Sequence, residues 1–434
     1  MRIVIVIILG ILLTFGWLKQ EEKYVSNDEI IYAETGFTPD ISSVNDLESR
    51  SCTDQLNYIP DPEFPNHMPS RQVKVNFHFM YDKNGKNNIA KKNAPEYIEG
   101  LLWNLNNRIK KNVKMHLPLN NSNPALYPGY QYVLSPDPKR PNDTGIYYHY
   151  DDDLYWFVNK GKTRNDYDKR AFEKYGVLKD EVLNVFVMPH HPDSIASKTY
   201  RNQLCGIAFP SQNWTKIAGS YATLKDTLIK NGKPFIRSGW FCHGVYNHEL
   251  GHVLGLHHTW GGNDGCDDTP NHTNCYSAGQ GKGNCRENWS NNVMDYNTHQ
   301  NSWSPCQIGL VQRNFANKKS SQRKILIPTW CKLDDENPVM IEKNIVWNGA
   351  RDLESHIIIQ PGRTLTINCR VSLPSMAQII VKQGATLILD GATIENDCGD
   401  QWDGIKVWGR GKNKGKVVML NGAQLANNRV SFKS

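Results

Sequence analysis

The sequence lacks a large excess of charge of either sign. Its 434 residues include 50 Lys and Arg against 43 Asp and Glu, a net charge of +7, and the basic residues are scattered along the chain. Proteins that bind phosphate backbones gather basic residues on one face, so we expect no nucleic-acid partner. Charged residues make up 21% of the chain and hydrophobic residues 39%, which excludes a disordered protein. A chain of this length is expected to form two or three folded units.

Long apolar runs are absent except at the N-terminus. Ile3–Leu18 carries no charge and lies between Arg2 and Lys19. It is long for the core of a signal peptide and short for a membrane span, and no clear small-x-small cleavage site follows it. We favour a signal peptide over residues 1–20 and a secreted protein that does not contact the membrane after signal cleavage. The alternative is a retained N-terminal anchor.

The rest of the chain divides into three parts. Residues 21–70 are polar and interrupted by prolines, which predicts a pro-segment or N-terminal arm. Residues 71–330 begin with alternating apolar residues from Val73 and a helical pattern over 97–113, which predicts an α+β domain with a mixed sheet. Further strands are expected at 130–134, 183–188 and 204–209.

Residues 331–434 contain a repeat. The segment 356–367 returns as 378–389 at an offset of 22 residues, and a looser third copy begins at Lys416, displaced by 38. Short β-rich units of this period bury their apolar rows only by stacking, so we expect a β-helix-like repeat domain. A plain β-sandwich is the alternative. The third copy ends near Ser434 without an evident polar cap, which suggests a truncated domain.

A histidine motif lies in the middle of the chain. His248, Glu249 and His252 form H-E-x-x-H, which Gly255 and His258 extend. Histidines four residues apart lie one turn apart on one side of a helix, so both reach one ion. Glycine tolerates the left-handed conformation that ends a helix, so a turn at Gly255 brings His258 to the same ion. Three histidines and a water form a catalytic zinc site, with Glu249 as candidate base.

Two other interpretations of this motif are weaker. Histidines on a Leu- and Val-rich helix can be ordinary surface or core residues, but the five specified positions recur by chance with a probability of roughly 10⁻⁴. A purely structural zinc usually has four protein ligands, often cysteines.

A second motif, 292–296, contains Met294 and Tyr296. Together the two motifs resemble the metzincin metallopeptidases, in which a methionine turn lies beneath the zinc. The segments 257–260 and 268–270, with Cys306 and the strands 183–187 and 206–210, resemble the pappalysin and cytophagalysin family over about residues 73–330. The repeats resemble C-terminal modules of secreted bacterial members.

The resemblance implies roles for individual residues. The zinc ligands would be His248, His252 and His258, with Met294 as the floor of the site. Tyr296 would stabilise the oxyanion of the tetrahedral intermediate. The strand containing Gly206, Ile207 and Ala208 would border the cleft and pair with an extended protein or peptide substrate. Residues 297–307 would shape the pocket beyond the cleaved bond, and they include no acidic residue to select Arg or Lys.

Ten cysteines in an exported chain are expected to form disulfides rather than buried thiols. The resemblance suggests the pairs Cys266–Cys285 and Cys275–Cys306 in a loop that also binds calcium. Pairs Cys369–Cys398 and Cys205–Cys242 are further candidates. Cys52 is either a zymogen switch that holds zinc or the partner of Cys331. The expected calcium ligands, with a solvated acidic turn as the alternative, are Asp264, Asp267, Asp268 and Thr269.

The sequence therefore predicts a secreted zinc endopeptidase that hydrolyses peptide bonds with a zinc-bound water activated by Glu249. The alternative is an extracellular binding or adhesion protein in which the repeats carry the function and the metallopeptidase domain is inactive. A narrower possibility is a metal-dependent hydrolase of non-peptide amides.

Overall fold

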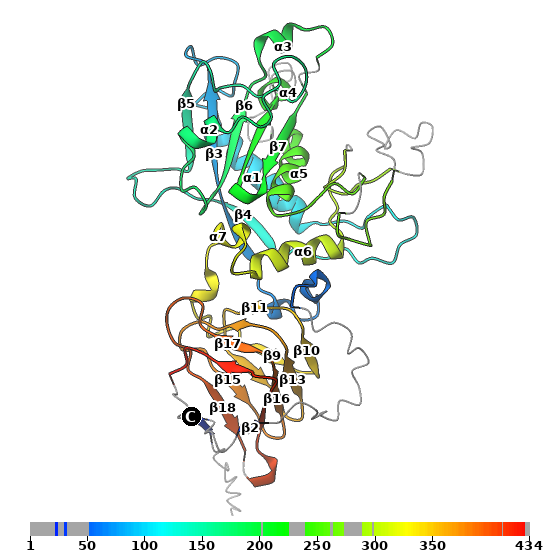
Figure 1. The fold of residues 1–434 in the computed structure, drawn as a ribbon, viewed down its shortest axis with the longest axis vertical. Coiled ribbons are helices and arrows are strands. Elements are labelled where there is room, and N and C mark those ends of the chain that lie inside the picture. The colour runs from blue at the N-terminus through cyan, green and yellow to red at the C-terminus, as the bar shows by residue number, and fades with distance from the viewer. Residues whose placement is uncertain are drawn as a thin grey trace, which may run out of the picture.

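The computed structural model describes residues 22–24, 30–32, 52–200, 203–224, 239–260, 264–272, 289–296, 299–409 and 411–429 (Figure 1). The expected signal peptide lies outside these residues. None of the helices in this part of the chain is both long and apolar enough to cross a membrane.

A six-stranded sheet forms the centre of the part that precedes residue 330. Its longest strand is β3 (Arg71–Tyr81), in which every second residue from Val73 to Phe79 is fully buried. The strand order is β4-β3-β6-β8-β7, and β5 pairs with the second half of β3. All pairs are parallel except that of β7 with β8. The other strands are β4 (Tyr130–Leu134), β5 (Ile146–Tyr150), β6 (Leu183–Met188), β7 (Cys205–Phe209) and β8 (Trp214–Ala218).

Both faces of this sheet are covered. Helices α1 (Ala94–Lys110) and α5 (His243–Val253) pack on one face, where their apolar residues join those of β3 and β6 in a single buried cluster. On the other face a second cluster forms around Trp214 and includes Phe172 from α2 (Arg170–Tyr175). Helix α5, which carries the histidine motif, packs against helix α1 and against strands β7 and β8 (Figure 1).

Further helices complete the described part of the chain. Helix α6 (Pro305–Ala316) begins with a capping box between Ser304 and Gln307, in which each side chain bonds the backbone of the other residue. The remaining helices are α3 (Pro192–Ala196), α4 (Ser220–Leu224), α7 (Ser321–Lys324), η2 (Gln55–Tyr58), η3 (Pro65–His67), η4 (Pro210–Gln212), η9 (Thr329–Cys331) and η10 (Gly411–Asn413).

The C-terminal strands form three sheets with a separate core. Successive turns of the chain each add one strand to every sheet, and all these pairs are parallel, which is consistent with a β-helix-like region. The strands are β9 (Val339–Ile341), β10 (Ile345–Trp347), β11 (Arg351–Asp352), β12 (Ile357–Ile359), β13 (Thr364–Ile367), β14 (Val371–Ser372), β15 (Ile379–Val381), β16 (Thr386–Asp390), β17 (Thr393–Glu395), β18 (Ile405–Trp408), β19 (Lys416–Leu420) and β20 (Gln424–Leu425).

The register of these strands agrees with the alignment of residues 356–367 with residues 378–389, and it corrects the alignment of the third copy, which begins at Lys416. Ile357 pairs with Ile379 and Thr364 with Thr386, which is the expected offset of 22 residues. The third copy, however, was aligned with the wrong strand, because Lys416 pairs with Thr386 at an offset of 30. The turn that contains β9–β11 was not expected.

The N-terminal arm packs against both parts of the chain. Strands β1 (Glu22–Tyr24) and β2 (Ile30–Tyr32) extend two of the C-terminal sheets by pairing with β18 and β19. Residues 52–68 lie between α6 and the first C-terminal turn: η2 packs against α6, and Asn66 donates to the carbonyl of Pro338.

The disulfides differ from every expected pairing. The structure joins Cys52 to Cys369, Cys266 to Cys306, and Cys331 to Cys398. These bonds rule out Cys266–Cys285, Cys275–Cys306, Cys369–Cys398, Cys52–Cys331 and the zymogen role of Cys52. Cys369 follows β13 whereas Cys398 follows β17, so the two lie at different corners of the strand stack. Cys275 and Cys285 lie outside the described residues.

The expected Cys205–Cys242 bond is also wrong, because both cysteines are free thiols. Cys205 packs with the apolar cluster on one face of the six-stranded sheet, and Cys242 lies in the cluster on the other face. The sheet therefore separates the two sulfur atoms.

Candidate active site

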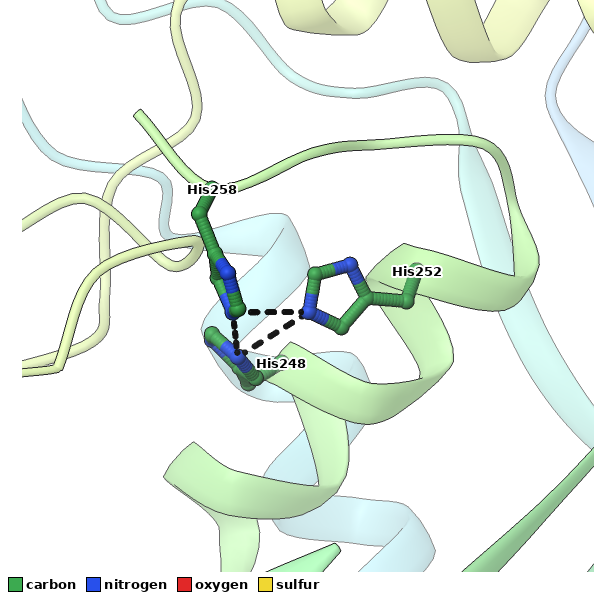
Figure 2. A group of neighbouring side chains, drawn as sticks. All are labelled: His248, His252 and His258. Carbon is green, nitrogen blue, oxygen red and sulfur yellow. Dashed lines mark hydrogen bonds between the residues drawn. The ribbon is translucent and has the colours of Figure 1, made fainter. Parts of the chain in front are cut away.

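Helix α5 carries two of the three histidines. Its residues Tyr246, Leu250 and Val253 are fully buried against the sheet and fix the rotation of the helix. His248 and His252 lie one turn apart and face His258, which follows the end of the helix (Figure 2).

The three imidazoles converge through their Nε2 atoms. Nε2 of His258 lies 3.1 Å from that of His248 and 3.1 Å from that of His252, and the remaining separation is 3.2 Å (Figure 2). Nδ1 of His248 lies 2.8 Å from the carbonyl oxygen of Val293, and Nδ1 of His252 lies 2.8 Å from that of Leu256. A carbonyl oxygen only accepts, so both Nδ1 atoms carry hydrogen and both Nε2 atoms present lone pairs to the centre.

This geometry fits a zinc ion. Nitrogen atoms at these separations lie about 1.8 Å from the centre of their triangle, so a point just above its plane is 2.0–2.1 Å from all three, which is the usual Zn–N distance. Burial lowers the pKa of all three histidines, to about 4 for His252 and well below the normal value for His248. The imidazoles are therefore neutral at neutral pH, as metal ligands must be.

Gly255 lets the chain turn toward the third histidine. Helix α5 ends at Val253, and Gly255 has a φ of 101°, a conformation that residues with a side chain rarely adopt. A Cβ atom there would also overlap with Nδ2 of Asn314, which donates to the carbonyl of Leu254. The turn is thus held by a close contact with α6.

Glu249 is buried beside strand β7. Its side chain is in such close contact with Gly206 that a Cβ atom at position 206 would lie 2.7 Å from Cδ and 2.8 Å from Oε1 of the glutamate. Burial raises the pKa of Glu249 to about 8, because the carboxylate has lost its hydration. A divalent cation at the histidine trio would favour the ionised form.

Strand β7 lies at the edge of the sheet. Among the described strands it pairs only with β8, so one side of its backbone is free of sheet partners. Gly206 and Ala208 face α5, and Ile207 joins the apolar cluster on the opposite face. The edge nearest the histidine trio is therefore available for an extended chain.

Met294 lies beneath α5. It is fully buried, and a Cβ atom at Gly251 would be 2.8 Å from its sulfur atom. Its backbone N–H donates to Oδ1 of Asn292, whose amide exchanges two hydrogen bonds with that of Gln307. Sequence reasoning missed Asn292 and Gln307, since a lone buried amide has no periodic signal.

Aromatic rings surround His258. The ring centroid of Tyr296 lies 4.9 Å from that of His258, and Trp260 stacks on the same imidazole at 5.2 Å. Tyr296 remains 42% exposed, and partial burial together with the charge of Glu249 raises its pKa. Its hydroxyl group is therefore protonated at neutral pH and can donate a hydrogen bond.

The loop after His258 is anchored to the methionine turn by Asp295, which the sequence analysis did not single out. Its Oδ1 accepts a hydrogen bond from the hydroxyl of Thr259, and its Oδ2 lies 3.1 Å from Nε2 of His272. Asp295 is only 2% exposed. One carboxylate thus ties both ends of the described part of this loop to the turn that contains Met294.

The expected calcium ligands make other contacts in this loop. Asp264 accepts from the hydroxyl of Thr269 at 2.6 Å, and Asp268 accepts from the N–H of Cys306 at 2.9 Å. Asp267 is exposed. Asp268 also lies near Cys266 and Cys306, but those sulfur atoms form a disulfide and are not thiolate ligands. The calcium site stays a prediction.

Comparisons with known proteins agree with the histidine motif. Residues 238–316 match the Peptidase_M43 family model, described as pregnancy-associated plasma protein-A. No curated protein matches the chain. The chain is similar to a structure of mirolysin in complex with a compound, at 19% identity and a TM-score of 0.40, over 59% of this chain and 96% of that one.

It is also similar to mature mirolysin of Tannerella forsythia in complex with a cleaved peptide, at 18% identity and a TM-score of 0.40, over 59% of this chain and 95% of that one. Promirolysin of the same organism matches at 17% identity and a TM-score of 0.40, over 59% and 84%. The family match over residues 238–316 confirms the resemblance to pappalysin-like metzincin metallopeptidases that the sequence motifs indicated.

Proposed function

We propose that the chain is a secreted zinc-dependent endopeptidase in which residues 71–330 form the catalytic domain and residues 331–434 a β-helix-like domain. The convergence of three neutral imidazole nitrogens beside a buried glutamate carries this proposal. A bound zinc would polarise the substrate carbonyl and lower the pKa of a coordinated water. The three disulfides among the described residues support an oxidising, extracellular location.

Glu249 supplies the proton transfers. Its carboxylate accepts the proton of the attacking water and then delivers it to the leaving amine. Contact with Gly206 holds this side chain between β7 and the histidine trio, so it cannot swing away from the reacting atoms. A site that only binds a ligand has no need of a base in this position.

Strand β7 and Tyr296 would position the substrate. The free edge of β7 offers backbone N–H and C=O groups to an extended peptide, which gives binding that tolerates many sequences. The Tyr296 ring lies next to His258, and its hydroxyl would donate where negative charge develops on the carbonyl oxygen. The β7 backbone and the Tyr296 hydroxyl would both contact the backbone of the substrate rather than a particular substrate side chain.

The test compares wild-type protein with Glu249→Gln on a denatured protein and on a peptide library, with zinc content measured in both. We expect both proteins to hold one zinc per chain. Cleavage should fall by at least 10³-fold in the variant and stop in the wild type when zinc is removed by a chelator. Equal cleavage by the two proteins would refute the proposed role of Glu249, and zinc-independent cleavage would refute the metallopeptidase.

A further inference from the structure

Charged side chains are buried where the N-terminal arm, α6 and the first C-terminal turn meet. Asp352 of β11 accepts hydrogen bonds from Arg323 and Arg370, and its side chain is 2% exposed. Arg71 of β3 pairs with Glu354 at 3.0 Å. Each of these three guanidinium groups therefore has a carboxylate partner, as buried charges normally require.

Arg351, which precedes Asp352 in β11, differs from them. Its Nε and NH1 atoms are buried and have no hydrogen-bond partner, and its NH2 makes only a long contact of 3.5 Å with the carbonyl oxygen of Asn57. No carboxylate of the described residues lies within ion-pair distance. Burial lowers the pKa of Arg351 to about 10, and the guanidinium is still charged at neutral pH. The residue as a whole is partly exposed and its guanidinium lies over the Trp347 ring, 5.9 Å from the centroid, but Nε and NH1 are buried without a hydrogen-bond acceptor.

A small cavity lies against this guanidinium group. It is lined by Arg351 and Arg71, by Tyr58 and His67 of the arm, and by Phe315 of α6 among others. It has room for one group of about the size of a water molecule. The carboxylate of Asp352 is occupied by Arg323 and Arg370, so no acidic group of the described residues compensates Arg351 there.

The other polar groups around the cavity already have partners. The Tyr58 hydroxyl donates to the carbonyl of Cys52 and accepts from the N–H of Ala350. His67 contacts the carbonyl of Met340 through Nε2. The free donors at the cavity are therefore those of Arg351, and the neighbouring Arg71 adds to the positive potential.

We propose that this cavity binds a monatomic anion of the size of chloride, held by Nε and NH1 of Arg351. A water molecule would accept a hydrogen bond but would leave the charge of Arg351 uncompensated. Phosphate and sulfate, each with five heavy atoms, exceed this space, whereas a monatomic anion such as chloride is only slightly larger than a water molecule. The anion would supply the counter-charge that the other three arginines obtain from Asp352 and Glu354.

Such an anion would link the arm to the rest of the molecule. Asn57 and Tyr58 approach Arg351 and Ala350 from the arm, whereas α6 contributes the opposite wall. Anything that binds only the folded state raises its stability in proportion to the logarithm of its concentration. Chloride would therefore stabilise the docked arm, and above the Kd the stabilisation would keep rising with the logarithm of the chloride concentration.

The test measures thermal unfolding of the full chain while sodium chloride replaces sodium gluconate at constant ionic strength. We expect Tm of the wild type to rise by about 2–4 °C across the exchange, in step with the logarithm of the chloride concentration. Arg351→Met should abolish this rise and should unfold in gluconate at the same or a higher temperature than the wild type, because no uncompensated charge remains. Arg363→Met is the matched control and should keep the rise, because Arg363 is exposed, lies between β12 and β13, and does not line the cavity.

A second measurement needs no variant. Crystals of wild-type protein in bromide should show an anomalous peak within hydrogen-bond reach of the Arg351 guanidinium. Absence of that peak would show that water alone occupies the cavity and would overturn the proposal. An equal chloride response in the wild type and Arg351→Met would also overturn it.

Discussion

Replacing Gly206 with alanine should remove most of the activity without removing the metal. The added Cβ atom would lie 2.7 Å from Cδ of Glu249, whereas ordinary contacts of this kind are 3.4–4 Å. The carboxylate must therefore move by about 1 Å, and displacements of that size in an active site cost about 10²-fold in rate. We expect kcat/KM to fall by about 10²-fold, equivalent to about 2.7 kcal/mol of transition-state stabilisation.

The assay is cleavage of a quenched fluorescent peptide, with zinc content and Tm measured on the same samples. Gly206 does not have a positive φ, so alanine brings no backbone strain there. Ile207→Val is the matched control because Ile207 faces the opposite side of the same strand; it should cost about 0.5–1.5 kcal/mol of stability and leave the rate unchanged. Wild-type activity in Gly206→Ala would refute the placement of Glu249 by β7.

Three further changes test the surroundings of the site. Gly255→Ala should lower both Tm and zinc content, because it combines strain at φ 101° with a clash against Asn314. Gly161→Ala is the control: Gly161 has a φ of 89° and a Cβ atom there would meet nothing within 4 Å, so this change should lower Tm alone. Equal zinc loss in the two variants would contradict this reasoning. Asp295→Asn should weaken zinc affinity by about 10- to 100-fold in a competition titration, since it loosens the loop after the third histidine; unchanged affinity would count against it. Burial opposes the charge of Asp352, but its arginine partners outweigh burial and hold the pKa of Asp352 at about 2, below the usual 3.8. In urea titrations, the free energy of unfolding of the wild type should therefore exceed that of Asp352→Asn by about 2 kcal/mol above about pH 4, and this difference should disappear as the pH falls to about 2. A difference that does not depend on pH would exclude this electrostatic origin.

Local patterns in the sequence were sufficient to predict the positions of several strands and helices. Strands β4 and β6 have the bounds that were expected for them, and helix α1 falls within a few residues of its expected position. The histidine trio was predictable because its spacing follows from the pitch of a helix and the freedom of glycine at position 255. These features depend on residues close together in the chain.

Features set by distant contacts were not predictable. Cys369 bonds to Cys52 across 317 residues, and only the packing of the arm against the first C-terminal turns brings the two together. The repeat alignment at Lys416 was wrong because its apolar pattern fits more than one strand, and the register is decided by stacking on Thr386. Asp295 and Arg351 carry no motif, so their roles emerge only from their neighbours in space.

X-ray absorption at the zinc edge of the purified full chain tests the central claim most directly. We expect one zinc per chain with three histidine nitrogens at about 2.0–2.1 Å, and one of these nitrogens lost in His258→Ala. A protein that contains no zinc, or a spectrum with sulfur ligands or unchanged by His258→Ala, would contradict it.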